Sequence, residues 1–130
     1  MTDETTQRFH DGLKVRRAVL GDAYVDKALA SSDAFWQPLQ EMVTEFCWGS
    51  VWTREGLDRR TRSLINIAML SALNRPHEVE IHLRGALNNG CTAEDIREVV
   101  LQVAAYCGVP AAIDTMRTAK RILAEAAEDT

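Results

Sequence analysis

The stretch LINIAMLSAL, residues 64–73, is hydrophobic on every side of a helix. A helix of this kind belongs in a protein core or in a subunit interface. Gly56-Leu57-Asp58 precedes the stretch, and we expect Asp58 to cap the helix that follows. Asn74-Arg75-Pro76 ends it, because a proline inside a helix removes a backbone hydrogen bond. The stretch therefore predicts a buried helix, from which the rest of the chain can be assigned outward.

On the C-terminal side the sequence predicts three more helices. Pro76 suits the first turn of a helix over 76–88, which Asn88-Asn89-Gly90 would end. Thr92 would cap the next helix, and the acids that follow it favour a helix start. Gly108-Val109-Pro110 predicts a sharp corner before a last helix over about 110–126. The expected inner faces of the first two of these helices consist of Val79, Leu83, Ala86 and Leu87, and of Ile96, Val99, Val100, Val103 and Ala104.

On the N-terminal side we expect a surface helix over about 3–19 that ends at Gly21, and a short helix over 24–30. Ser31-Ser32-Asp33 is typical of a helix start, with Pro38 in the first turn and Gly49 as the expected end. The hydrophobic residues of this helix, spaced by three or four, are Phe35, Leu39, Met42, Val43 and Phe46. No segment alternates with period two. The sequence therefore predicts an all-α protein, a single compact domain over 1–130 with about six or seven helices.

Charge and composition exclude several classes of function. The net charge is −4, so a broad basic surface for nucleic acid or acidic lipid is not expected. The N-terminus has no hydrophobic run typical of a signal peptide, and no stretch has the roughly 18 hydrophobic residues that a membrane span needs. We therefore expect a cytoplasmic protein.

Cysteine chemistry is not favoured. Cys47, Cys91 and Cys107 form no CxxC pair and no zinc-site spacing, so we expect three reduced, largely buried thiols and no metal. There is also no phosphate-binding loop, no nucleophile elbow and no HExxH motif.

His82 is the first candidate catalytic residue. Its spacing from Val79 and Ala86 places it on or near the buried stripe, where an imidazole can donate or accept a proton near neutral pH. Glu78, four residues earlier, could orient it. The alternatives are a structural histidine bonded to a backbone carbonyl, and a surface pair of Glu78 with His82.

Arginines and aromatic residues supply the candidates for substrate binding. Arg62, Arg75 and Arg84 could each hold a carboxylate through two parallel hydrogen bonds, although surface ion pairs are the more common use. Glu45 lies one turn before Trp48, and Trp48 and Trp52 could line a small pocket that raises the pKa of the acid. Packing in a core or an interface is the more common use of tryptophan.

Four motifs together resemble the carboxymuconolactone decarboxylase family, within the alkyl hydroperoxide reductase D-like superfamily. They are WGSVW at 48–52, GLDRRTRSLINIAML at 56–70, HLRGALNNG at 82–90 and YCGVPAA at 106–112. The resemblance covers roughly residues 8–124 and is strongest to the decarboxylases proper. It implies an all-helical fold and a homo-oligomer, a trimer or a hexamer. The related reductases use a CxxC before the histidine, where this chain has Glu78, so a thiol peroxidase activity is the weaker alternative.

The resemblance also implies a reaction and roles for the residues. 4-Carboxymuconolactone would lose carbon dioxide to give 3-oxoadipate enol-lactone in protocatechuate breakdown, without a cofactor, because the lactone accepts the electrons itself. His82 would donate to the lactone oxygen or supply the proton, with Glu45 as the alternative acid or the residue that orients His82. Arg62 and Arg84 would hold the substrate carboxylates, and Trp48 and Trp52 would exclude water. A paralogue that acts on another small lactone, and a non-catalytic helical oligomer, remain as further alternatives.

Overall fold

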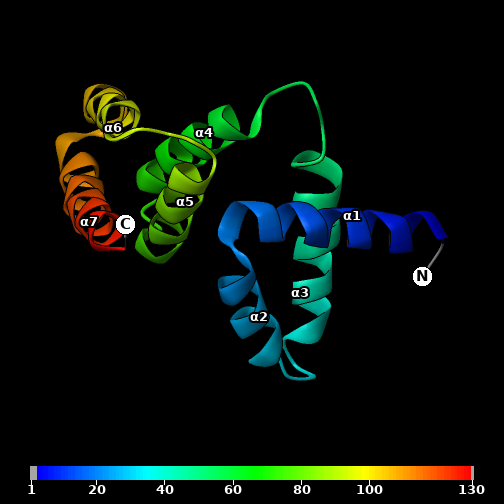
Figure 1. The fold of residues 1–130 in the computed structure, drawn as a ribbon. Coiled ribbons are helices and arrows are strands. Elements are labelled where there is room, and N and C mark those ends of the chain that lie inside the picture. Colours follow the sequence, from blue (N-terminus) through cyan, green and yellow to red (C-terminus); the bar gives the residue numbers. More distant parts are fainter. Residues whose placement is uncertain (1–2, 130) are drawn as a thin grey trace. The chain divides into compact units, whose positions relative to one another are not determined.

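A computed structural model describes residues 3–129 of the chain (Figure 1). Within this range the chain forms seven α-helices and one π-helix and has no strand, which confirms the all-α prediction. None of these helices combines the length and the hydrophobicity needed to cross a membrane. The chain divides after Arg59 into a first unit and a second unit, each compact.

The first unit contains α1 (Asp3–Leu20), α2 (Asp22–Ala30), α3 (Gln37–Met42) and the π-helix η1 (Val43–Val51). Gly21 separates α1 from α2 as predicted, with a φ of 91° that favours glycine. The side chain of Asp33 accepts a hydrogen bond from the backbone N–H of Trp36, and α3 then begins with Pro38 in its first turn. The predicted helix start is therefore a turn that leads into a helix a few residues later.

Gly49 does not end the helix, contrary to the prediction. It lies inside η1, where α1 packs directly against η1. A Cβ atom on Gly49 would clash with the backbone oxygen of Arg8, and one on Gly12 would clash with the backbone of Thr44 and Gly49. Both glycines are thus needed for the close approach of two helices rather than for a turn. The core beside this crossing consists of Val15, Val19, Trp48 and Trp52.

The second unit contains α4 (Arg59–Ala72), α5 (Pro76–Asn88), α6 (Ala93–Cys107) and α7 (Val109–Glu128), and α7 packs against both α5 and α6 (Figure 1). Thr92 and Asp95 form the predicted cap, each side chain accepting a hydrogen bond from the other residue's backbone N–H. The breaks at Asn74, Gly90 and Gly108 all have positive φ. The core of this unit contains Ile67, Val79, Leu83, Ala86, Ile96, Val100, Val103, Ala112, Ala119 and Ile122, among others.

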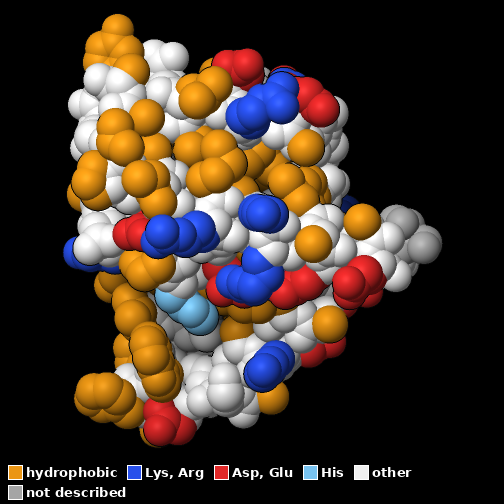
Figure 2. Space-filling view, turned by 90° about the vertical axis from the view of Figure 1, so that its left-hand side faces the viewer, with side chains coloured by type: hydrophobic (Ala, Val, Ile, Leu, Met, Phe, Trp, Pro, Cys, Tyr) orange, Lys and Arg blue, Asp and Glu red, His pale blue; other side chains and the backbone are white. Residues whose placement is uncertain are grey.

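Many large hydrophobic side chains are nevertheless exposed in the described chain. In the first unit they include a stripe along α3, η1 and the turn before them, where Phe35, Leu39, Met42 and Phe46 recur every three or four residues. In the second unit they include Ile65, Met69 and Leu73 of α4 and Leu101, Tyr106, Ile113 and Met116 of α6 and α7. Figure 2 shows one face of the molecule, on which hydrophobic side chains are grouped between charged ones.

Candidate functional site

Helix α5 holds His82 at the edge of the core of the second unit. Val79, Leu83 and Ala86 are buried on the inner face of α5, and His82 beside them is half-buried. This agrees with the predicted position on or near the buried stripe. Burial lowers the pKa of His82 from 6.5 to about 4, because a cationic ring loses hydration there. The imidazole is therefore neutral at physiological pH and acts as a hydrogen-bond donor and acceptor.

Asn66 of α4 contacts the ring. Its Nδ2 lies 3.4 Å from Nδ1 of His82. Sequence analysis missed this residue and considered Glu78 and Glu45 instead. Glu78 is exposed on α5, and Glu45 belongs to the first unit. The available signal was an amide residue within a mostly hydrophobic stretch, since a polar side chain buried in such a place generally has a hydrogen-bonding partner.

Arg62 lies on the same face of α4 as Asn66, since residues four apart in a helix are neighbours. Its side chain is half-buried and its Nε atom is buried. The structure therefore brings Arg62, Asn66 and His82 to one region of the second unit, on two helices. Arg75 instead is exposed at the start of α5 and donates hydrogen bonds to the carbonyl oxygens of Leu73 and Asn74.

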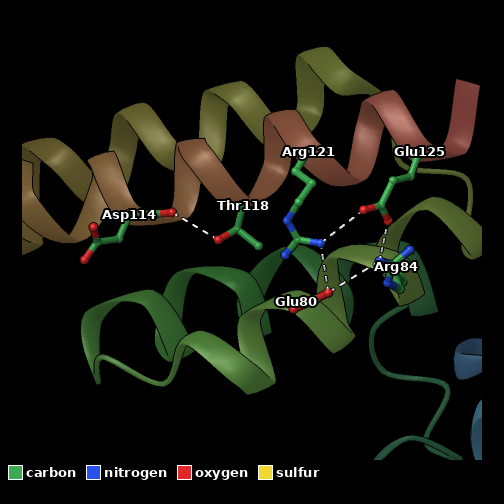
Figure 3. Close-up of polar contacts among 6 residues, drawn as sticks. All are labelled: Glu80, Arg84, Asp114, Thr118, Arg121 and Glu125. Carbon is green, nitrogen blue, oxygen red and sulfur yellow. Dashed lines mark hydrogen bonds and ion pairs between the residues drawn. The ribbon is translucent and has the colours of Figure 1, made fainter.

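Arg84 belongs to a network of ion pairs between α5 and α7 (Figure 3). Nη2 of Arg84 lies 2.6 Å from Oε2 of Glu125 and 3.4 Å from Oε1 of Glu80. Nη1 of Arg121 lies 3.1 Å from Oε1 of Glu80 and 3.2 Å from Oε1 of Glu125. Arg121 lowers the pKa of Glu80, and Arg84 lowers the pKa of Glu125, so both acids stay charged. The two arginines and two glutamates balance in charge. Arg84 would have to break its ion pairs with Glu80 and Glu125 before it could bind the carboxylate of a substrate.

Glu45 lies in the first unit and forms an ion pair with Arg8 at 3.0 Å. It borders an open pocket of about 430 Å³. The lining of this pocket is mostly hydrophobic with two acids and consists of Phe9, Pro38, Glu41, Met42, Glu45 and Phe46.

Trp48 and Trp52 are packed in the core of the first unit. Their rings stack with centroids 4.8 Å apart, and only 4% and 7% of the two residues is exposed. They pack with Val15 and Val19 and do not border the pocket at Glu45. The two tryptophans thus pack in the core of the first unit, and their role toward a substrate stays a prediction.

All three cysteines are free thiols as predicted, but the predicted burial was right for one residue of three. Cys91 is buried in the second unit, whereas Cys47 and Cys107 are exposed. Among residues 3–129 the structure contains no group of three or more His, Cys, Asp or Glu side chains that could hold a metal ion.

Comparisons with known proteins agree with the motifs. The model of the carboxymuconolactone decarboxylase family matches residues 37–121. The chain is 47% identical to nitrosuccinic acid decarboxylase of Metarhizium robertsii, over 88% of this chain and 80% of that protein. It is 43% identical to 4-carboxymuconolactone decarboxylase of Acinetobacter baylyi, over 94% of this chain and 90% of that protein. A 4-carboxymuconolactone decarboxylase sequence of Pseudomonas putida is 49% identical over 33% of this chain and 90% of its own length.

Proposed function

This chain belongs to the carboxymuconolactone decarboxylase family, and we propose that it decarboxylates 4-carboxymuconolactone to 3-oxoadipate enol-lactone without a cofactor, in the breakdown of protocatechuate. The observation that carries the proposal is the similarity to the Acinetobacter baylyi enzyme over nearly the whole of both chains. Nitrosuccinate is the second candidate substrate, because the Metarhizium robertsii relative is similar to a comparable degree.

The two candidate substrates share a chemical core. In each, one carbon carries the departing carboxylate, a neighbouring –CH₂–COO⁻ group and an electron-accepting group. That accepting group is the unsaturated lactone in one compound and the nitro group in the other. Each is therefore a 2-substituted succinate, and the substrate class we propose is a succinate with an electron acceptor on the carbon that loses carbon dioxide.

The reaction needs one stabilised oxyanion and one proton. When the bond to the carboxylate breaks, its electron pair moves onto the lactone carbonyl oxygen or onto the nitro oxygens, and a proton then adds to carbon. A hydrogen-bond donor placed at such an oxygen contributes on the order of 10²–10³ in rate. Neutral His82 of α5 suits this role, because its ring N–H donates a hydrogen bond and the ring does not have to be protonated first. Glu45 remains the alternative acid.

Arg62 is the better candidate for holding the carboxylate that stays on the substrate. It lies one helical turn from Asn66, which contacts His82. Arg84 is the second candidate, because Glu80 and Glu125 already bind it. The departing carboxylate is better left without a cation, since a contact that stabilises the ground state more than the transition state slows the reaction.

Arg62→Gln is expected to raise KM by about tenfold or more with a smaller change in kcat, because it removes a charge that binds substrate and transition state alike. The matched variant Arg84→Gln should change KM by less than about threefold. Steady-state kinetics of both variants measure the difference. A larger KM effect at Arg84 would exchange the two roles.

We also propose that the protein works as a homo-oligomer, a trimer or a hexamer. The exposed stripe of Phe35, Leu39, Met42 and Phe46, and the exposed Ile65, Met69 and Leu73 of α4, support this. Large exposed hydrophobic patches are rare on monomers and mark interaction surfaces.

The test is a decarboxylation assay with purified protein. Freshly generated 4-carboxymuconolactone is followed by ultraviolet absorbance, and nitrosuccinate by released carbon dioxide. We expect the higher kcat/KM for the lactone. A higher value for nitrosuccinate would favour the second candidate, and no turnover of either compound would overturn the proposal.

A further inference from the structure

The contact between Asn66 and His82 has a consequence for the location of the ring proton. A neutral imidazole carries one proton, so one ring nitrogen donates and the other accepts. The amide Nδ2 of Asn66 is a donor and faces Nδ1 of His82 at 3.4 Å. In this orientation of the amide, Nδ1 is the accepting nitrogen and the ring proton belongs on Nε2.

We propose that Asn66 is a positioning residue, which holds His82 as the Nε2–H tautomer and so supplies the N–H that stabilises the oxyanion formed on decarboxylation. This inference rests on the proposed function for its catalytic part, whereas the tautomer itself does not depend on any substrate. The partner of one ring nitrogen generally determines the role of the other.

The surroundings of His82 favour orientation of the ring by the hydrogen bond of Asn66 over orientation by a charged side chain. The low pKa of His82 keeps the ring neutral, so its tautomer matters more than its charge. On α5 the charged residues nearest to His82 in sequence are Glu80 and Arg84, which belong to the ion-pair network with α7, and then Glu78, one turn before His82. On α4 the nearest is Arg62, one turn before Asn66. Glu78 is exposed. An amide orients the ring without adding a charge that would make the imidazole cationic.

The experiment reads the tautomer directly from ¹⁵N-histidine-labelled protein. Two-bond ¹H–¹⁵N correlation spectra at about pH 8 show which ring nitrogen carries the proton. The signals of His82 are those that disappear in His82→Gln, since the chain has only two other histidines. Asn66→Asp replaces the donor by an acceptor, and Asn66→Leu removes the hydrogen bond at similar volume. Asn88→Asp is the matched control, because Asn88 is exposed at the end of α5.

The wild-type protein should show the Nε2–H tautomer, and Asn66→Asp should place a proton on Nδ1, because a carboxylate accepts a hydrogen bond and cannot donate one. We expect kcat to fall on the order of 10²-fold in Asn66→Asp and about tenfold in Asn66→Leu, with KM within about threefold. Asn88→Asp should match the wild type in tautomer and in kcat.

Two results would overturn the proposal. One is a wild-type His82 with its proton on Nδ1, which decides the question even when the Asn66 variants do not fold. The other is an Asn66→Asp protein that keeps the Nε2–H tautomer and the wild-type kcat. A correct tautomer in a protein that turns over neither substrate would instead leave the positioning role intact and remove the proposed function.

Discussion

Replacing His82 with alanine is expected to lower kcat for decarboxylation by about 10²–10³-fold, the usual cost of removing one donor to a developing oxyanion. The melting temperature should change by only a few degrees, because the half-buried ring lies at the edge of the core and not inside it. His77→Ala is the matched control, since His77 is exposed on the same helix. Turnover in His82→Ala close to that of the control would remove His82 from the mechanism.

The pH dependence provides a second readout for His82. Its folded-state pKa of about 4 predicts that kcat shows no step from this residue between about pH 5 and pH 8. Stability behaves differently. The unfolded chain titrates its histidine near 6.5, so between about 6.5 and 4 the unfolded state binds more protons than the folded state. His82 therefore lowers the free energy of unfolding as the pH falls through this range, and His82→Ala should lose less stability on acidification than the wild type.

Gly12→Ala is expected to destabilise the first unit by about 2–3 kcal/mol. In an ordinary helix the same change would stabilise by about 0.5–1 kcal/mol, because alanine is the better helix former. Here the new Cβ would lie closer than 3 Å to backbone atoms of Gly49 in η1, and backbone cannot turn away as a flexible side chain can. Overpacking should therefore exceed the gain in helix propensity.

Tryptophan fluorescence during urea unfolding measures this effect selectively, because all three tryptophans, Trp36, Trp48 and Trp52, lie in the first unit. Gly56→Ala is the control. Beyond its two chain neighbours, no residue has an atom within 4 Å of a Cβ at Gly56, so the unfolding midpoint of Gly56→Ala should stay near that of the wild type. An unchanged midpoint in Gly12→Ala would show that α1 and η1 do not approach as closely in solution.

The sequence by itself determined the helices and most of their ends. The cap of Thr92 and Asp95, the proline in the first turn of α5 and the positive-φ breaks at Asn74, Gly90 and Gly108 depend on residues a few positions apart. Such interactions are encoded locally, and period-3.6 hydrophobic patterns identify the buried faces of α5 and α6 in the same way.

Only the tertiary structure decided which side chains meet. Asn66 reaches His82 across 16 positions, Arg84 reaches Glu125 across 41, and Gly49 fits against Arg8 across a similar distance in sequence. The burial of Trp48 and Trp52 and the exposure of Phe46 and Met42 were also settled by packing. The physical reason is that periodicity shows which residues share a helix face, whereas the partner of that face depends on how helices distant in sequence pack together.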